Sequence, residues 1–183
     1  TGLRAEMRND AVQGMNDVIP FPRRLIQAGW FYPGSACGCI MQEACFWTRD
    51  LYSKVGGIDC KWQMAADFDL WIRFSEYAEL VALPALLGAF NYCNTNRSQA
   101  DGGQLYKQEV ELIRSGICSE IRQVGDALNR KQTIGKRFLF KHPWMRALIG
   151  EFLRQTKEKG PILGFHAGAD KYVLHSAQLF MPL

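Results

Sequence analysis

Hydrophobic residues recur every three or four positions in two long runs of this 183-residue chain. That spacing is typical of an amphipathic helix with one apolar face. The first run starts at Asp67 and places Leu70, Trp71 and Phe74 on one side. The second run extends from Gln104 to Asn129, and its recurring apolar residues are Val110, Ile113, Ile117, Ile121, Val124 and Leu128. We predict a helix for each run.

Shorter elements precede and separate these helices. Pro22 can open a short helix over Arg23–Ala28 that Gly29 ends, and Thr48 can cap another that Gly56–Gly57 ends. Cys39–Trp47, CIMQEACFW, is predicted to be a mostly buried strand. Leu80–Tyr92, LVALPALLGAFNY, is predicted to be extended on both sides of a break at Pro84.

The order of these elements predicts an α/β domain whose helices gather towards its C-terminal end. Residues 134–160 mix basic and apolar positions, and we expect helices on both sides of Pro143. Residues 161–183 show no clear period. We therefore divide the chain into residues 1–100, a mixed sheet with flanking helices, and residues 101–183, a basic, amphipathic helical extension.

The composition and the charge distribution indicate a cellular compartment and a possible membrane-binding surface. No apolar run reaches the roughly 20 residues that span a bilayer. The six cysteines form no CxxC pair and have no zinc-site spacing, so we expect buried free thiols and a cytoplasmic location. Arg130 to Lys159 carries a net charge of +7, whereas the rest of the chain carries about −3. This basic segment is either a solvated helical face or a surface that docks on the inner, anionic face of a membrane. No nucleic-acid motif is recognised, so no nucleic-acid partner is expected.

Two carboxylates, Asp67 and Asp69, open the first long helix, and three interpretations are open. Residues two apart on a helix point in different directions, so both cannot face one substrate. We expect Asp67 at the N-cap, facing a cleft, and Asp69 in the first turn beside the positive end of the dipole. As a cap alone, Asp67 would bind the N–H of Asp69 or Leu70. As a general base, it would be kept ionised by the helix N-terminus and would accept a proton from an alcohol. A metal-binding pair is less favoured, because such pairs more often follow a strand.

The order of motifs resembles the C-terminal half of the catalytic domain of family 2 glycosyltransferases, above all of bacterial enzymes that build surface polysaccharides. The resemblance covers about Phe21 to Glu111 and is carried by IMQEACFWTRDLYSKVGGID and AADFDLWIRFSEYAELVALPALLGAFNYCNTNRS. These stretches match a Gln-containing strand, a Phe with basic residues, a Gly-Gly turn, an acidic-aromatic-Asp-Leu-Trp helix start, a Leu-Pro strand and a loop ending in Ser.

The resemblance implies part of a GT-A fold and an inverting sugar transfer from a nucleoside-diphosphate sugar to a hydroxyl of a glycan or lipid-linked acceptor. Asp67 falls at the position of the general base, preceded here by Ala66 in place of an acidic residue. Trp71 is expected in the core rather than as a sugar platform, and Arg73 is expected to pair with a neighbouring acid. The candidate substrate-binding residues are Gln42, Asp69, Asn94, Asn96 and Arg97. For Gln42 a buried, satisfied amide is an equal alternative, and for Asp69 the alternative is support of the helix and loop.

Two departures from the family pattern limit these expectations. Cys93 stands where many relatives have a metal-binding His, and a thiol is a poor ligand for Mg²⁺. The nucleotide-binding half with its Asp-x-Asp motif has no counterpart before Phe21. We therefore expect a divalent cation, Mg²⁺ or Mn²⁺, held mainly by residues outside this chain, and no sugar transfer by the 183 residues alone. The alternative function is a non-catalytic module that binds a membrane surface or a protein partner.

Overall fold

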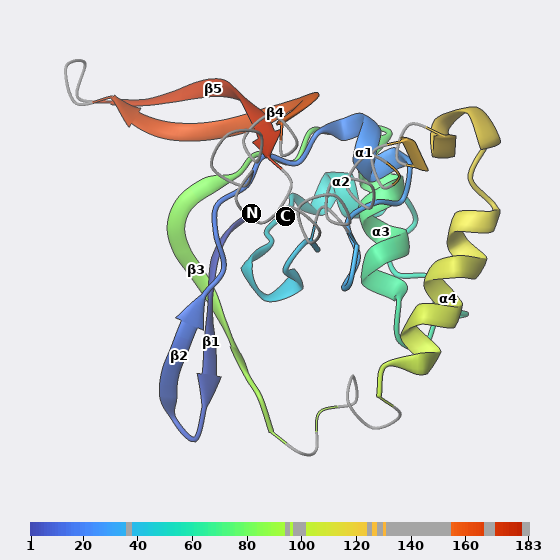
Figure 1. The fold of residues 1–183 in the computed structure, drawn as a ribbon, viewed down its shortest axis with the longest axis horizontal. Helices are drawn as coiled ribbons and strands as arrows, with labels where there is room; N and C mark the ends of the chain where they lie inside the picture. Colours follow the sequence, from blue (N-terminus) through green and yellow to red (C-terminus); the bar gives the residue numbers. More distant parts are fainter. Residues whose placement is uncertain are drawn as a thin grey trace, which may run out of the picture.

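The computed structural model describes residues 1–35, 38–93, 96, 102–123, 126–127, 130, 155–166 and 171–180. It is a mixed α/β fold, as predicted (Figure 1). Its elements, in chain order, are β1 (Gly2–Arg8), β2 (Ala11–Met15), α1 (Arg23–Gln27), the 3₁₀ turn η1 (Gln42–Ala44), α2 (Arg49–Lys54), α3 (Ala66–Ser75), β3 (Leu83–Asn91), α4 (Gln104–Ser115), β4 (Gln155–His166) and β5 (Lys171–Phe180).

The first sheet has the strand order β2-β1-β3. Strand β1 runs antiparallel to β2 and parallel to β3. Asn9 and Asp10 connect β1 to β2, and their φ angles of 51° and 59° are those of a type I′ hairpin turn. The hydrophobic pattern did not predict this hairpin, because β2 is largely exposed and lacks a clear alternation of apolar and polar residues.

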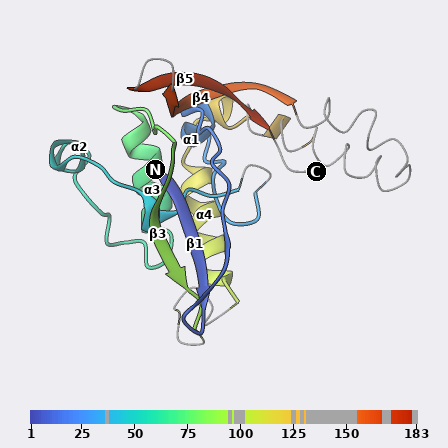
Figure 2. The same cartoon turned by 90° about the vertical axis from the view of Figure 1, so that its left-hand side faces the viewer.

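The helices lie to one side of this sheet, with α3 between it and the outermost helix, α4 (Figures 1 and 2). Helix α3 is covered on two faces. Leu70, Trp71 and Phe74 pack in the main core with residues of α1. Phe68 packs with Val110 and Ile113 of α4 in a second cluster. Trp71 is only 6% exposed, which confirms its predicted place in the core.

The two short predicted helices are confirmed. Pro22 precedes α1, and Gly29 after it has a φ of +68°. The Thr48 hydroxyl oxygen accepts the Leu51 N–H at 3.2 Å and caps α2. Gly56 and Gly57 follow α2 with φ angles of +79° and +72°, a region that glycine enters without the steric cost of a side chain.

Two predicted elements are wrong. Cys39–Trp47 is an extended loop interrupted by η1 rather than a strand, and none of its residues belongs to a ladder of the described sheets. Helix α4 ends at Ser115 and is followed by Gly116, so the run to Asn129 is not one helix. The apolar period continues past this point, but residues 117–118 break the helix before residues 119–123 are helical again.

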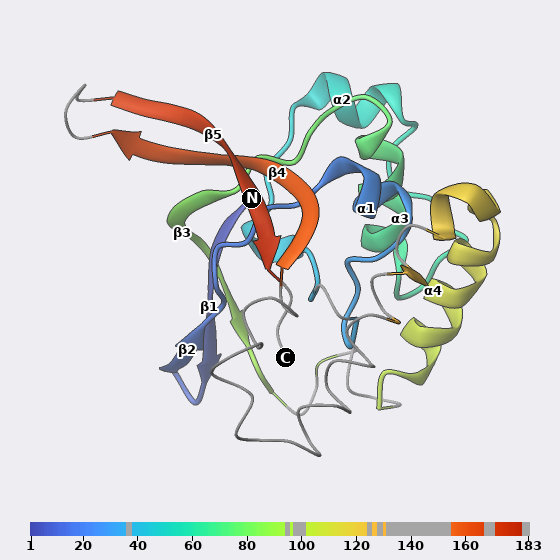
Figure 3. The same ribbon diagram turned by 45° about the horizontal axis from the view of Figure 1, so that its top comes forward.

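The helical extension is also wrong for its described C-terminal part, which forms the β4–β5 hairpin. The strands pair antiparallel from Gln155 opposite Phe180 to His166 opposite Lys171. This hairpin lies on the other side of the molecule from α4 (Figures 1 and 3). Residues 161–183 showed no clear period, and the hairpin forms by pairing of two segments that follow each other in the chain. Residues 131–154, including Pro143, lie outside the described residues, and the division of the chain near residue 100 stays a prediction.

The cysteines differ from the expectation of buried thiols. Cys45 is buried, but Cys60, Cys93 and Cys118 are exposed, and all the cysteines in the described ranges are free. Among the described residues, no helix combines the length and apolar character needed to cross a membrane.

Arg73 joins α3 to the turn that ends α2. Its guanidinium meets the Asp69 carboxylate at 2.7 Å and 2.8 Å, one helical turn back. The same group donates to the carbonyl oxygens of Val55 at 2.7 Å and Gly57 at 2.8 Å. The predicted pairing of Arg73 with a neighbouring acid is confirmed. Because the planar guanidinium serves the acid and both carbonyls at once, a lysine cannot replace it.

Arg73→Lys is therefore expected to lower the free energy of unfolding by about 2 kcal/mol, since the two carbonyl contacts are lost. Urea denaturation followed by circular dichroism measures this. Arg49→Lys, at an exposed position of α2, is the control and should change stability by less than about 0.5 kcal/mol. Equal effects of the two substitutions would contradict a linking role for Arg73.

Candidate functional site

Asp67 is the second residue of α3, because Ala65 rather than Asp67 is the N-cap. The Asp67 Oδ1 accepts the N–H of Phe68 at 2.7 Å. The Asp69 N–H instead donates to the Ala65 carbonyl at 3.1 Å. The predicted N-cap position is therefore wrong, and so are the capping bonds from Asp69 or Leu70. The helix starts earlier than its apolar spacing indicated, and this places the carboxylate within the first turn.

The start of α3 is held by Glu109, a buried residue of α4. Its carboxylate accepts the N–H groups of Gln63 at 2.9 Å, Met64 at 2.8 Å and Ala65 at 2.8 Å. Burial works against the charged form of Glu109, but these three donors outweigh it and hold the pKa of the carboxyl below its ordinary value. Glu109 thus fixes the chain immediately before Asp67. Sequence reasoning missed it because the contact joins segments more than 40 residues apart.

Burial raises the pKa of Asp67 to about 6, and the nearby Glu43 carboxylate adds to the rise. The Phe68 N–H and the N–H of Asp67 itself oppose it. We expected the helix N-terminus to favour the charged form. The pKa is instead raised, because the cost of removing the carboxylate from water outweighs the stabilisation by the backbone donors. At neutral pH Asp67 is still mostly ionised, but its proton affinity is much higher than that of an ordinary aspartate.

Three further titratable side chains lie within electrostatic reach of Asp67, and together with it we call them the Asp67 cluster: Cys39, Glu43, Asp67 and Tyr106. Burial raises the pKa values of the Cys39 thiol and the Tyr106 hydroxyl, and the charge of Asp67 raises both further. The members come from a loop, from η1, from α3 and from α4. No local signal marks Cys39, Glu43 or Tyr106 in the sequence, because only the tertiary fold brings these segments together.

Glu43 is held in this cluster by Arg4 of β1. The guanidinium lies 3.4 Å from the Glu43 carboxylate and 3.1 Å from that of Glu6. Arg4 is 8% exposed and also lies over the Phe90 ring, 5.2 Å from its centroid. The backbone of Glu43 packs against β3 at Gly88, where a Cβ would overlap the Glu43 carbonyl. Strands β1 and β3 of the sheet therefore hold η1 in position.

The predicted substrate-binding residues are not all placed beside Asp67. Gln42 lies on η1 and is exposed, so its interpretation as a buried amide is wrong, and so is the strand predicted to carry it. Asp69 is engaged by Arg73, which agrees with support of the helix and loop. The Asn96 side-chain amide donates to the Asn91 carbonyl at 2.9 Å, and its oxygen accepts from the Cys93 thiol. Asn94 and Arg97 lie outside the described residues.

A metal site within the described ranges is not supported. No group of three or more His, Cys, Asp or Glu side chains there is arranged to hold a metal ion. Cys93 is exposed and bonded to its own loop. The expected divalent cation, held mainly by residues outside this chain, stays a prediction, and no chemical step is assigned to a metal among the described residues.

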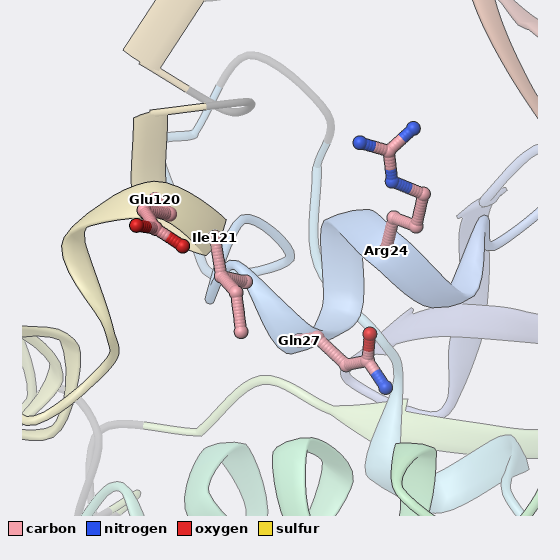
Figure 4. A pocket seen from close by; sticks show the side chains of 4 residues that line it. All are labelled: Arg24, Gln27, Glu120 and Ile121. Carbon is pink, nitrogen blue, oxygen red and sulfur yellow. The ribbon is translucent and has the colours of Figure 1, made fainter.

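Two pockets bordered by described residues lie away from Asp67. One, of about 240 Å³, lies between α1 and the helical residues 119–123 and is lined by Arg24, Gln27, Glu120 and Ile121 (Figure 4). The larger, of about 410 Å³, borders α2 and the later turns of α3 and includes Trp47 and Trp71. Asp67 is instead a half-buried carboxylate among other titratable groups, and it lines neither of these two pockets.

Glu109→Ala is expected to lower the free energy of unfolding by about 3 kcal/mol at pH 7, because three N–H groups lose a charged acceptor. Since the folded pKa of Glu109 is depressed, its contribution is present above the ordinary value of 4.5 and is lost as the pH falls through the folded pKa. Urea denaturation at pH 7 and pH 3 checks both statements. Glu111→Ala, at an exposed position of the same helix, is the control. A cost for Glu109→Ala no larger than the control's would exclude the anchoring role.

Asp67→Asn is expected to stabilise the protein at pH 8 and to leave it nearly unchanged below pH 3.8. The folded pKa of about 6 lies above the ordinary 3.8, so the ionised carboxylate costs stability that the protonated form does not. The gain is at most about 3 kcal/mol, and less to the extent that solvent reaches the carboxylate. Chemical denaturation at several pH values measures it, with the exposed Asp17→Asn as control. A loss of stability at pH 8 would mean that Asp67 serves the helix rather than a reaction.

With this geometry established, the chain was compared with family models, with curated proteins and with solved structures, and it matches none of them.

Proposed function

We propose that this chain is the acceptor side of an inverting glycosyltransferase of the family 2 type, with Asp67 as its general base. The main support is the Asp67 carboxylate, whose pKa burial raises to about 6 and which lies among three other titratable side chains. A strongly perturbed carboxyl with identifiable causes is a candidate for catalysis. The motif order from Phe21 to Glu111 supports the reaction class. A partial GT-A fold belongs to this proposal, because the mixed sheet alone does not distinguish it from other α/β folds.

The raised pKa suits a general base better than the depressed one that the sequence suggested. A base is most effective when its pKa lies near the working pH, since it is then ionised and still binds a proton firmly. In the proposed step, the acceptor oxygen forms a bond to the anomeric carbon while its proton moves to Asp67. The bond from that carbon to the diphosphate breaks, and the diphosphate leaves with the electron pair. Attack on the face opposite the leaving group inverts the anomeric centre.

Other residues of the chain have supporting roles in the proposal. Glu43 keeps about a third of its side chain exposed despite its pairing with Arg4, so its carboxylate can accept a hydrogen bond from an acceptor hydroxyl. Glu109 and Arg73 keep α3 in position. The donor nucleotide and any cation that neutralises its diphosphate would be bound by residues other than those described.

The alternative, a non-catalytic module that docks on a membrane or a protein, depends on the basic segment Arg130–Lys159. Most of that segment lies outside the described residues. Such a module gives no reason for the raised pKa of Asp67, whose carboxylate does not cap the helix.

In the intact enzyme that contains this chain, Asp67→Asn is expected to lower kcat by about 10²–10⁴-fold, because proton removal is lost while the shape is kept. Release of the nucleoside diphosphate from UDP-glucose, UDP-N-acetylglucosamine and GDP-mannose measures the reaction. In the unsubstituted enzyme, kcat/KM should fall as the pH drops below about 6, where Asp67 becomes protonated.

Asp59→Asn makes the same chemical change on an exposed loop and is the control. Near-normal turnover by the Asp67→Asn enzyme, in the presence of an active control, would remove Asp67 from the mechanism. Absence of turnover in the unsubstituted intact enzyme with every donor would argue for the non-catalytic alternative.

A further inference from the structure

The larger pocket, of about 410 Å³, is independent of the Asp67 cluster. Its volume falls within the range of roughly 300–1,000 Å³ that is usual for small-molecule sites. We call it the Trp71 pocket, after the residues of its wall that matter here: Trp47, Lys54, Trp71, Phe74, Tyr77 and Ala78.

The wall of the Trp71 pocket is largely apolar, and five of its side chains are aromatic. The Trp47 ring lies 5.5 Å from the Trp71 ring and 5.7 Å from the Phe74 ring, measured between centroids. Trp47 nevertheless remains 40% exposed and Tyr77 49% exposed. Phe46 beside them is 70% exposed. Large aromatic side chains that stay in water around a concave surface indicate a place that a ligand covers.

Two polar groups of the pocket form no hydrogen bond or ion pair in the described part of the chain. The indole N–H of Trp71 is buried and donates no hydrogen bond there. Because water does not reach this N–H, a ligand in the pocket does not reach it either, and the polar group that a ligand can meet is the Lys54 ammonium. The Lys54 ammonium lies 4.3 Å from the centroid of the Tyr77 ring and forms no ion pair within the described ranges. Glu79 also borders the pocket and is exposed.

We propose that the Trp71 pocket binds a single-chain lipid anion, with the aliphatic chain against the aromatic wall and the anionic head at Lys54. A largely apolar wall bordered by the exposed Lys54 ammonium fits an apolar body that carries an anionic head. The Glu79 carboxylate repels an anionic head group, whereas the Lys54 ammonium attracts it. Removal of either charge should therefore change the affinity in opposite directions. This proposal does not depend on the glycosyltransferase proposal.

Isothermal titration of the 183-residue chain with dodecyl phosphate, kept below its micelle concentration, tests the proposal. We expect saturable 1:1 binding. Octyl and decyl phosphate should bind progressively more weakly, by about fourfold for each methylene that no longer reaches the pocket. Dodecyl maltoside should bind at least fivefold more weakly than dodecyl phosphate, and inorganic phosphate should not bind. Dodecyl maltoside and inorganic phosphate separate the contribution of the ligand's aliphatic chain from that of its anionic head group.

Four variants locate the binding. Ala78→Phe should fill the pocket and weaken dodecyl phosphate at least tenfold. Lys54→Gln should weaken it about fivefold without changing the affinity for dodecyl maltoside. Glu79→Gln should strengthen it. Lys107→Gln, an exposed lysine of α4, is the matched control and should have no effect. Circular dichroism checks folding, and the opposite shifts of the Lys54 and Glu79 variants give a test even if Ala78→Phe does not fold.

Several outcomes would overturn the proposal. They are the absence of saturable binding, equal affinity for the neutral and anionic dodecyl ligands, and the same effect of Lys54→Gln and Lys107→Gln. Sedimentation velocity tests one more outcome. If the unsubstituted protein is a dimer and the folded Ala78→Phe variant is a monomer, a second copy of the chain covers this pocket instead of a lipid.

Discussion

The buried carboxylate of Glu109 is the contact on which the rest of the site depends. A carboxylate removed from water is costly unless donors replace its hydration. Here the donors are three successive backbone N–H groups at positions 63–65, which end at the N-cap of α3. These three hydrogen bonds compensate the buried charge of Glu109, and they also determine where α3 begins. The packing of Phe68 against Val110 lies beside it and excludes water from the same region.

Two carboxylates in the first turn of α3 are placed in different environments by this arrangement. Asp69 faces Arg73, whose guanidinium also holds the carbonyls after α2. Within the described part of the chain, Asp67 forms no ion pair, and it accepts one short backbone hydrogen bond from Phe68. One acid thus contributes to the architecture, whereas the other bears a desolvation cost. Such a cost persists where it is offset by the surrounding packing, and it is most often found where chemistry takes place.

Helix α3 also relates the two proposed sites. Its ten residues span about 15 Å, with Asp67 in the first turn and Trp71 and Phe74 on the later turns. The first end is polar and buried among titratable groups, and the other borders an aromatic pocket. Because one regular helix carries both, the separation between them is set by helix geometry rather than by loops. Their chemistry is different, so a failure of either proposal leaves the other standing.

The sequence by itself determined the elements that are stabilised by nearby residues. Pro22 before α1, the Thr48 hydroxyl on the first turn of α2, the two glycines after it and the pairing of Arg73 with a neighbouring acid all act within about one turn. Local pattern was therefore sufficient. The helix that carries Asp67 was predicted for the same reason. The tertiary structure decided the rest. Glu109 reaches positions 63–65, Arg4 reaches Glu43, and β1 pairs with β3, all across long stretches of chain. The direction of the Asp67 pKa shift was decided there as well, because burial is a property of the packed molecule, whereas the capping and dipole effects that predicted the opposite sign are local.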